Sequence, residues 1–315
     1  MMTNDSNTGS QPPEQLGFGR FVLIFAILLI AAELLLHAVG WLQQQLGYFL
    51  QDIETAPVAT DIFVALSNGI FTFLTVAALF VFIEWRQLRF SDFRIRYRDG
   101  LIYSVVALAI SILVQAAEFS LLRSWGVEPI FAADDLGPVL VAFPLIYLLL
   151  LGLMEYWLHR ALHHFDFLWR FHAIHHQIED LNAARSYSHF GQDVIYILLI
   201  TTPLVLLIDA PQQHIMLVTT FFLISNYYMH SDAPALSFPA PLRHIFADNV
   251  YHHHHHTRDV RHIGKNYASF FSFFDRIFGS QYMPKDGEFP ETGIDGYLPI
   301  ASLSDYVLRP FGPKT

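Results

Sequence analysis

Cysteine is absent from this chain of 315 residues, whereas histidine occurs 17 times. Without cysteine the chain has no disulfide, thiolate zinc site, iron–sulfur cluster or covalent c-type haem. Any metal must therefore be held by nitrogen and oxygen. Charged residues are also scarce, at 15% against 53% hydrophobic residues. A soluble globular chain is about a quarter charged, so the composition indicates an integral membrane protein.

The charge balance argues against a nucleic-acid-binding protein, and the N-terminus argues against a cleaved secretory signal. The formal net charge of −10 argues against a nucleic-acid partner. Residues 1–17 are polar and lack the basic region that opens a secretory signal, so we expect a disordered N-terminal tail.

Long hydrophobic runs organise the first half of the chain. Four of them are long enough to cross a bilayer, which needs about 20 apolar residues, and they lie near residues 18–39, 61–84, 101–122 and 138–158. Two shorter runs, near 194–208 and 214–230, form either a spanning pair or a re-entrant hairpin. We favour a helical hairpin that enters and returns on the same side. The predicted fold class is all-α: a polytopic membrane helical bundle of four long transmembrane helices plus a shorter hairpin, with a histidine-rich helical cap.

The distribution of arginine predicts the orientation of this bundle. Residues 86–98 contain five arginines, whereas the connections 40–60 and 124–137 contain no Lys or Arg. The positive-inside rule therefore places 86–98 in the cytoplasm and the two connections outside. The fourth run then returns to the cytoplasm at His159, and the histidine-rich region follows on that side. The membrane would be the inner membrane of a bacterium or the endoplasmic reticulum of a eukaryote.

The stretch from His159 to His176 has the spacing of a metal site. His172, His175 and His176 stand at i, i+3 and i+4, so a helix presents all three on one face. His159 and His163 stand at i, i+4, and His164 adds a partner on the adjoining face. The alternative is an exposed helix that is rich in histidine by chance, which such repeated face-matched spacing disfavours.

Two later segments repeat this pattern. Asn226 and His230 are again four residues apart at the end of an apolar run. Within the run of five histidines, His252, His255 and His256 reproduce the spacing of the upstream HxxHH box. The alternatives are an affinity tag or a low-complexity metal buffer. The internal position of the run and its matching spacing favour a specific metal box.

The ordered set HRALHH, HAIHH, NYYMH and HHHHH, followed by KNYASFFSFFDRIFGS, resembles the fatty acid hydroxylase superfamily. That superfamily includes sterol desaturases, C-4 methylsterol oxidases, fatty acid 2-hydroxylases and alkylglycerol monooxygenases. The resemblance covers roughly residues 140–285. It implies a non-haem site with two iron ions at the cytosolic face, O2 as oxidant and a lipid as substrate. Zinc is expected to compete for such nitrogen ligands in purified protein.

The resemblance assigns the site residues one by one. The implied metal ligands are His159, His163, His164, His172, His175, His176, His230, His252, His255 and His256. The resemblance also points to His189 and Asn226 as supporting residues. Independently of it, Glu155 and Asp275 are candidate carboxylates to accept the second N–H of a ligand imidazole, the alternative for each being a solvated surface acid. His253 and His254 are left out, because relatives carry other residues there. Two octahedral irons need about eight to ten donors, so the boxed histidines are enough for two ions and too many for one.

The predicted function is hydroxylation of a C–H bond of a sterol, fatty acyl or alkyl-glycerol lipid. Desaturation on the same site is the alternative within the enzyme class. A metal transporter with a His-rich cytosolic loop is the alternative from another class, and it would need ligands at mid-membrane. The chain has no redox cofactor motif, so the electrons must come from a separate reductase, cytochrome, ferredoxin or pterin.

The predicted organisation has four parts. They are a tail at 1–17, N-terminal transmembrane helices at 18–137, a hydroxylase-like catalytic domain at 138–285 and a C-terminal tail at 286–315.

Overall fold

The computed structural model describes residues 57–85, 93–132, 137 and 142–312, together with isolated positions between 23 and 45. The α-helices are α2 (Pro57–Trp85), α3 (Phe93–Ser124), α4 (Phe143–His164), α5 (Asp166–His176), α6 (Phe190–Tyr196), α7 (Thr202–Leu207), α8 (Gln212–His230), α9 (Ala240–Arg243), α10 (Asn249–His255), α11 (Phe273–Ile277) and α12 (Leu303–Leu308). A π-helical turn, η3 (Ile197–Thr201), joins α6 to α7, and three 3-10 turns are η4 (Pro234–Leu236), η5 (Val260–His262) and η6 (Arg309–Phe311). The short strands are β1 (Phe131–Ala132) and β2 (Ile208–Asp209).

Four helical stretches among the described residues are long and apolar enough to cross a membrane. They are residues 65–84, 100–124, 143–164 and 190–207. The prediction of a polytopic helical membrane bundle is therefore confirmed. The predicted segment 18–39 lies mostly outside the described residues, and the isolated positions described within it are helical.

The helix α4 begins and ends later than the apolar run at 138–158 predicted. It starts at Phe143 with Pro144 in its first turn, where a missing N–H costs nothing. It continues through His159 to His164 and ends where Phe165 adopts an extended backbone, with φ −97° and ψ 119°. The first histidine box is thus the last turns of this helix rather than a segment beyond it, because hydropathy marks the apolar run and not the end of the hydrogen-bond ladder.

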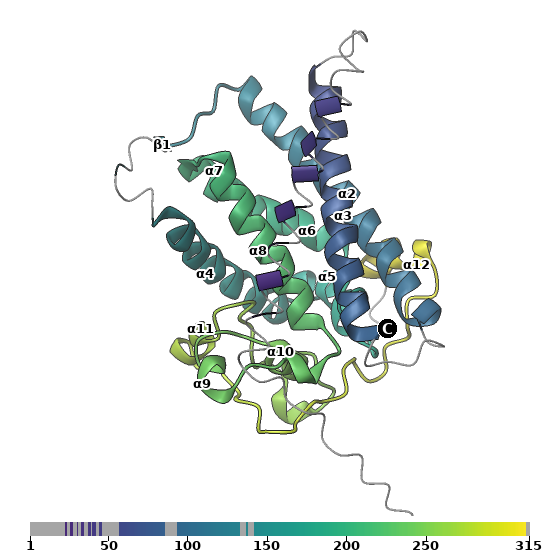
Figure 1. Cartoon of the computed structure of the whole chain (residues 1–315). Helices are drawn as coiled ribbons and strands as arrows, with labels where there is room; N and C mark the ends of the chain where they lie inside the picture. The colour runs from purple at the N-terminus through teal and green to yellow at the C-terminus, as the bar shows by residue number, and fades with distance from the viewer. Residues whose placement is uncertain are drawn as a thin grey trace, which may run out of the picture.

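The second hairpin runs the full length of the bundle. Its first arm is α6, η3 and α7, and its second arm is α8. The π-turn η3 precedes Pro203, which has no N–H to continue a regular ladder. At the tip, β2 pairs in parallel with β1, so the tip lies where α3 ends and α4 begins (Figure 1). Both outer ends of the hairpin lie on the histidine side. Its first arm, residues 190–207, is long and apolar enough to cross a membrane, whereas α8 is not among the candidate spans of the described residues, so the choice between a spanning pair and a re-entrant hairpin stays a prediction.

Two apolar clusters hold the hairpin against the other helices. In one, Tyr147 and Leu151 of α4 pack with Ile200, Leu204 and residues of α8. A second cluster joins α2 to α8 through aromatic rings. Packing on both faces therefore holds the arms in place, and it sets the position of His230, the last residue of α8.

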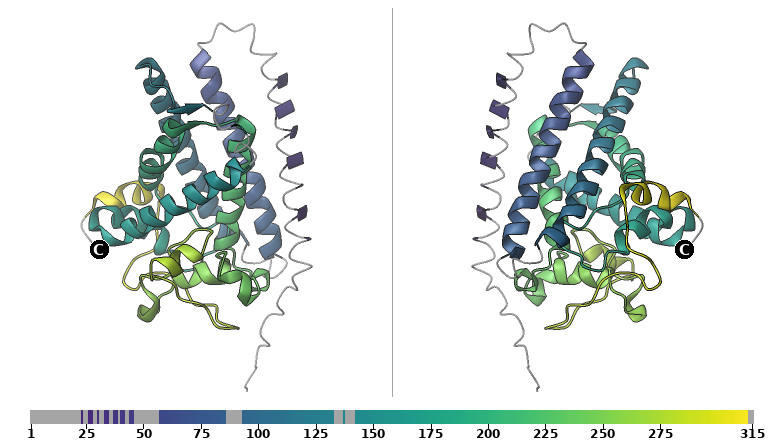
Figure 2. Two further views of the ribbon diagram at one scale, coloured as in Figure 1. Left: turned by 90° about the vertical axis from the view of Figure 1, so that its left-hand side faces the viewer. Right: turned by 90° about the vertical axis from the view of Figure 1, so that its right-hand side faces the viewer.

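A cap of short helices and loops closes the histidine end of the bundle. The helices α9, α10 and α11 lie together below the long helices, and α5 crosses nearby (Figures 1 and 2). Buried Glu84 ties the end of α2 to this cap, since its carboxylate accepts hydrogen bonds from the backbone N–H groups of Ala183 at 2.9 Å and Asp232 at 2.8 Å. The C-terminal segment also packs against α3, where the buried Tyr306 ring stacks on Tyr103.

Candidate metal centre

The first histidine group comes from three helices. His159 and His163 lie one turn apart in α4, His172 and His176 one turn apart in α5, and His255 ends α10. Their Nε2 atoms converge. His172 Nε2 lies 3.0 Å from that of His159 and 3.0 Å from that of His176, while His163 Nε2 lies 3.1 Å from His176 and 3.2 Å from His255.

The second group contains four buried histidines: His175 of α5, His230 at the end of α8, and His252 and His256 at the two ends of the histidine run. His230 Nε2 lies 3.0 Å from His175 Nε2 and 3.0 Å from His252 Nε2, and His252 lies 3.2 Å from His256. The two groups are neighbours, because the rings of His176 and His256 stack at 4.2 Å.

The donor set of each group fits a metal ion. Imidazole nitrogens bind first-row metals at about 2.0–2.1 Å, so adjacent ligands of one ion lie about 3 Å apart. The closest Nε2 separations in both groups are 3.0 Å. Among the described residues, no carboxylate belongs to either group. A metal ion held by either group would therefore have imidazole ligands, and these suit iron, copper or zinc rather than magnesium or calcium.

Hydrogen bonds made by the Nδ1 atoms of five of these histidines explain why their Nε2 atoms point into the groups. A ligand imidazole donates its other N–H to an acceptor, which fixes the ring and its tautomer. The pairs are His159 with the Tyr267 carbonyl at 2.6 Å, His172 with Gln192 Oε1 at 2.9 Å, His175 with the Tyr187 carbonyl at 3.3 Å, His230 with the Asn226 carbonyl at 2.6 Å and His255 with the Lys265 carbonyl at 2.8 Å. Four of the five acceptors are backbone carbonyls, which leave no signature in the sequence.

Asp275 acts on the site through one of these carbonyls. It is fully buried and accepts hydrogen bonds from the N–H groups of Tyr267 and Ala268, both at 2.8 Å, and from Ser280 Oγ at 2.7 Å and the Tyr251 hydroxyl at 3.0 Å. These bonds hold the loop whose Tyr267 carbonyl orients His159. Asp275 therefore supports His159 indirectly, through the loop that contains Tyr267.

Two histidines assigned by the resemblance lie outside both groups. His164 is exposed at the end of α4, and its ring packs edge-on against Phe165. His189 is buried away from both groups, where it caps α6: its Nδ1 accepts from the N–H of Gly191 at 3.0 Å and its Nε2 donates to the Val307 carbonyl at 3.2 Å. His189 thus fixes the start of the hairpin rather than contributing a ligand.

The five histidines at 252–256, four in α10 and His256 at its C-cap, have different surroundings. The N-cap of α10, Asp248, accepts from the N–H of Tyr251 at 2.8 Å and pairs with buried Arg243 at 2.6 Å, which fixes the rotation of the helix. His253 Nε2 lies 3.4 Å from the His230 carbonyl, and the His253 ring packs on Phe289. His254 Nδ1 donates to the Val250 carbonyl at 2.8 Å. Neither residue joins a group.

A cavity of about 90 Å³ opens directly against both groups. Leu158, Leu162 and Met229 form part of its wall, beside ligand histidines of both groups. Its other lining residues are polar: Glu155, Gln192, Tyr196, Asn226 and Ser269. Glu155 is hydrogen-bonded to Ser269, and its Oε2 is buried without a partner among the described residues. The cavity therefore combines an apolar wall with hydrogen-bonding groups beside the candidate metal ligands.

Burial keeps the cap histidines neutral. It holds the pKa of His172, His176 and His252 well below the usual 6.5, and the neighbouring imidazoles lower each pKa further. The same causes lower the pKa of His255 and His256. Neutral imidazole is the form that binds metal, so these residues need not lose a proton to do so at pH 7.

Acid is expected to release bound metal in a steep transition below pH 6.5. An unfolded histidine titrates near 6.5 and the folded ones lower, so the unfolded state takes up protons first. The free energy of unfolding therefore falls as pH drops below 6.5 and through the lower pKa values of the folded state. Metal analysis after dialysis at stepped pH measures this. Metal loss above pH 7, where every imidazole is already neutral, would contradict a shell made only of histidine.

A bundle of membrane-length helices with nine converging imidazoles, five in one group and four in the other, is the architecture of a histidine-ligated membrane metalloprotein. The comparison with known families agrees with this class. Residues 144–280 match the fatty acid hydroxylase family model, and this match spans every histidine of both groups. Residues 144–280 are therefore similar to the fatty acid hydroxylase family, and the resemblance drawn from the histidine boxes is confirmed.

Three curated relatives are similar to part of the chain. Alkylglycerol monooxygenase of Homo sapiens is 29% identical over 40% of this chain and 27% of its own length. The Danio rerio alkylglycerol monooxygenase is 30% identical over the same shares. A very-long-chain aldehyde decarbonylase of Oryza sativa subsp. indica is 26% identical over 44% of this chain and 23% of its own length. The chain thus spans about a quarter of these relatives. No solved structure gives a significant match.

Proposed function

We propose that this chain is a membrane lipid hydroxylase that holds two iron ions, one in each histidine group, and uses O2 with electrons from a separate donor. The observation that carries the proposal is the pair of adjacent all-imidazole groups beside one cavity. The family match and the two monooxygenase relatives support the reaction class.

Bound iron would supply the activation of O2 that an unactivated C–H bond requires. The chain itself would hold the ligand imidazoles in position. Nine imidazoles would hold the ions, and the acceptors on Nδ1 keep five of those rings in place before any metal binds.

The cavity is the proposed position of the reacting part of the lipid. Leu158, Leu162 and Met229 would contact the alkyl chain and exclude water from the site. The Glu155 carboxyl, with Ser269 beside it, offers a hydrogen bond to a polar group of the lipid and so would help to fix which carbon lies nearest the metals. Asn226 lies on the same wall as a hydrogen-bonding residue rather than a ligand.

We propose that the site faces the cytoplasm, because residues 86–98 of the sequence contain five arginines and Glu84, at the end of α2, is bonded to the histidine-side cap. The electron donor would then be a cytosolic or membrane-bound reductase, cytochrome, ferredoxin or pterin.

Comparison of lipids from cells with and without the gene, grown under ¹⁸O2, tests this function. We expect one lipid class to carry a new hydroxyl group labelled with ¹⁸O only when the gene is present and its histidines are intact. A new double bond without ¹⁸O would instead identify a desaturase. Identical lipid profiles together with altered cellular metal uptake would contradict an oxygenase and favour the metal-transport alternative.

A further inference from the structure

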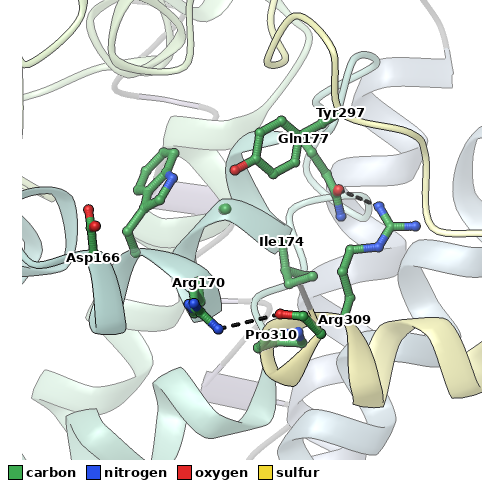
Figure 3. A pocket seen from close by; sticks show the side chains of 10 residues that line it. Asp166, Arg170, Ile174, Gln177, Tyr297, Arg309 and Pro310 are labelled. Carbon is green, nitrogen blue, oxygen red and sulfur yellow. Dashed lines mark hydrogen bonds between the residues drawn. The ribbon is translucent and has the colours of Figure 1, made fainter. Parts of the chain in front are cut away.

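A second cavity, of about 240 Å³, lies on the opposite face of α5 from the metal centre. Its wall is formed by α5, which contributes Arg170 and Gln177, and by the C-terminal segment, which contributes Tyr297 and Arg309 (Figure 3). Trp169 also lines it, and the Trp169 ring contacts the ligand His163 at 4.9 Å between centroids. Nothing in the proposed reaction uses this cavity.

Gln177 leaves a hydrogen-bond donor unmet in this cavity. Only 5% of the residue is exposed, and its Oε1 accepts a hydrogen bond from the Arg309 guanidinium at 2.7 Å. Arginine has only donors, so the atom that faces it must be the amide oxygen. The Nε2 group is then buried without a partner among the described residues. A buried amide N–H calls for an acceptor, and here the acceptor is missing.

Arg170 adds an uncompensated positive charge. Within the described part of the chain its guanidinium makes one long hydrogen bond, to the Gly312 carbonyl at 3.4 Å, and no ion pair (Figure 3). Arg309 is paired with Asp305, and Asp166 is the one acidic residue in the cavity wall. The Arg309 guanidinium is already bonded to Asp305, Gln177 and two backbone carbonyls, so the free donors of the cavity are those of Arg170 and the Gln177 amide. Together they form a site for an anion with several oxygen acceptors, such as a phosphate group.

The surroundings of the cavity indicate where the anion comes from. The helix α5 begins directly after the membrane-length helix α4, and Phe167 in its first turn is 67% exposed. On the facing segment, Leu308 is also exposed, and Phe311 is 64% exposed. Exposed apolar side chains beside basic groups at the end of a membrane helix are typical of the lipid headgroup layer.

We propose that this cavity binds the phosphate of an anionic phospholipid, with Arg170 and the Gln177 amide as its principal donors and Phe167, Leu308 and Phe311 against the acyl region. The lipid would bridge α5 and the C-terminal segment. Because the other face of α5 carries His172, His175 and His176, occupancy would also steady three candidate metal ligands.

Lipid binding by the purified full-length chain in detergent, followed by native mass spectrometry and titration, tests this site. The probes are phosphatidylglycerol, phosphatidylcholine and inorganic phosphate. Gln177→Glu keeps an acceptor for Arg309 but replaces the free donor with negative charge, and Arg170→Gln removes the unpaired cation. Arg261→Gln is the matched control, because Arg261 is exposed and pairs with Asp259 outside the cavity.

We expect the wild-type chain and Arg261→Gln to prefer phosphatidylglycerol over phosphatidylcholine, and each cavity variant to lose about 10-fold or more in affinity for phosphatidylglycerol. Unchanged metal content in both cavity variants shows that they are folded. The proposal is overturned if both variants bind phosphatidylglycerol as the wild type does, or if the wild type shows no preference for it. Inorganic phosphate bound as tightly as the lipid would overturn the lipid assignment.

Discussion

Replacing His255 with alanine is expected to abolish lipid turnover and to lower bound metal. His255 Nε2 lies 3.2 Å from His163 Nε2, and its Nδ1 is fixed by the Lys265 carbonyl, so the variant removes a pre-oriented ligand of the first group. Loss of an outer partner of a ligand costs about 10–100-fold in affinity or activity, and loss of the ligand itself should cost at least about 100-fold. Oxygen-dependent lipid turnover and metal content, measured on the same preparation, give both values.

His253→Gln is the matched control within the same run of histidines. The His253 side chain is buried but meets the His230 carbonyl and Phe289 rather than either group. We expect a small loss of stability, about 1 kcal/mol for one altered buried hydrogen bond, with metal content and turnover largely kept. If His253→Gln loses as much metal as His255→Ala, the five histidines form a loose metal-binding tract instead of a defined site.

Asp275→Ala is expected to destabilise the cap as a whole. The substitution leaves four buried donors without their acceptor: two backbone N–H groups and the hydroxyls of Tyr251 and Ser280. Each such donor costs about 1–3 kcal/mol, so the total exceeds about 4 kcal/mol, a large part of the stability of a typical domain. The Tyr267 carbonyl then no longer holds His159, and metal should be lost with the fold.

Thermal unfolding in detergent and metal content measure this effect. Asp295→Ala serves as the control, because Asp295 is an exposed acid in the C-terminal part of the chain. A midpoint and a metal content equal to those of the control would show that the loop around Tyr267 does not depend on Asp275.

Helical spacing predicted which histidines share a face, but not how they divide between the groups. His172, His175 and His176 belong to one box, yet the structure places His175 in the second group with His230. The division depends on how α5 meets α4, α8 and α10, and no local pattern encodes these long-range contacts. The run at 252–256 is split in the same way, with His255 in the first group and His252 and His256 in the second.

The supporting residues were harder to foresee than the histidines. Carboxylates were expected to orient the imidazoles, whereas backbone carbonyls do so for His159, His175, His230 and His255. A carbonyl is present at every residue, so only the fold reveals which one is used. Gln192 is the exception, since it orients His172 with its side chain, but it stands alone between two hydrophobic runs without a motif.

The full length of the second hairpin also required the structure. Apolar length alone did not show how far the hairpin extends, and the pairing of β1 with β2 places its tip beside the connection between α3 and α4. This matters for the site because α8 places His230 at the metal centre only when it returns along the whole bundle.

The number of iron ions bound per chain tests the central claim most directly. The purified chain is loaded anaerobically with Fe(II), freed of excess metal and analysed for iron and protein. We predict two ions per chain for the wild type, and a loss of iron when either His163 of the first group or His230 of the second is replaced by alanine. One ion per chain in the wild type, or two ions retained when both histidines are replaced, would contradict a two-metal centre built from these two groups.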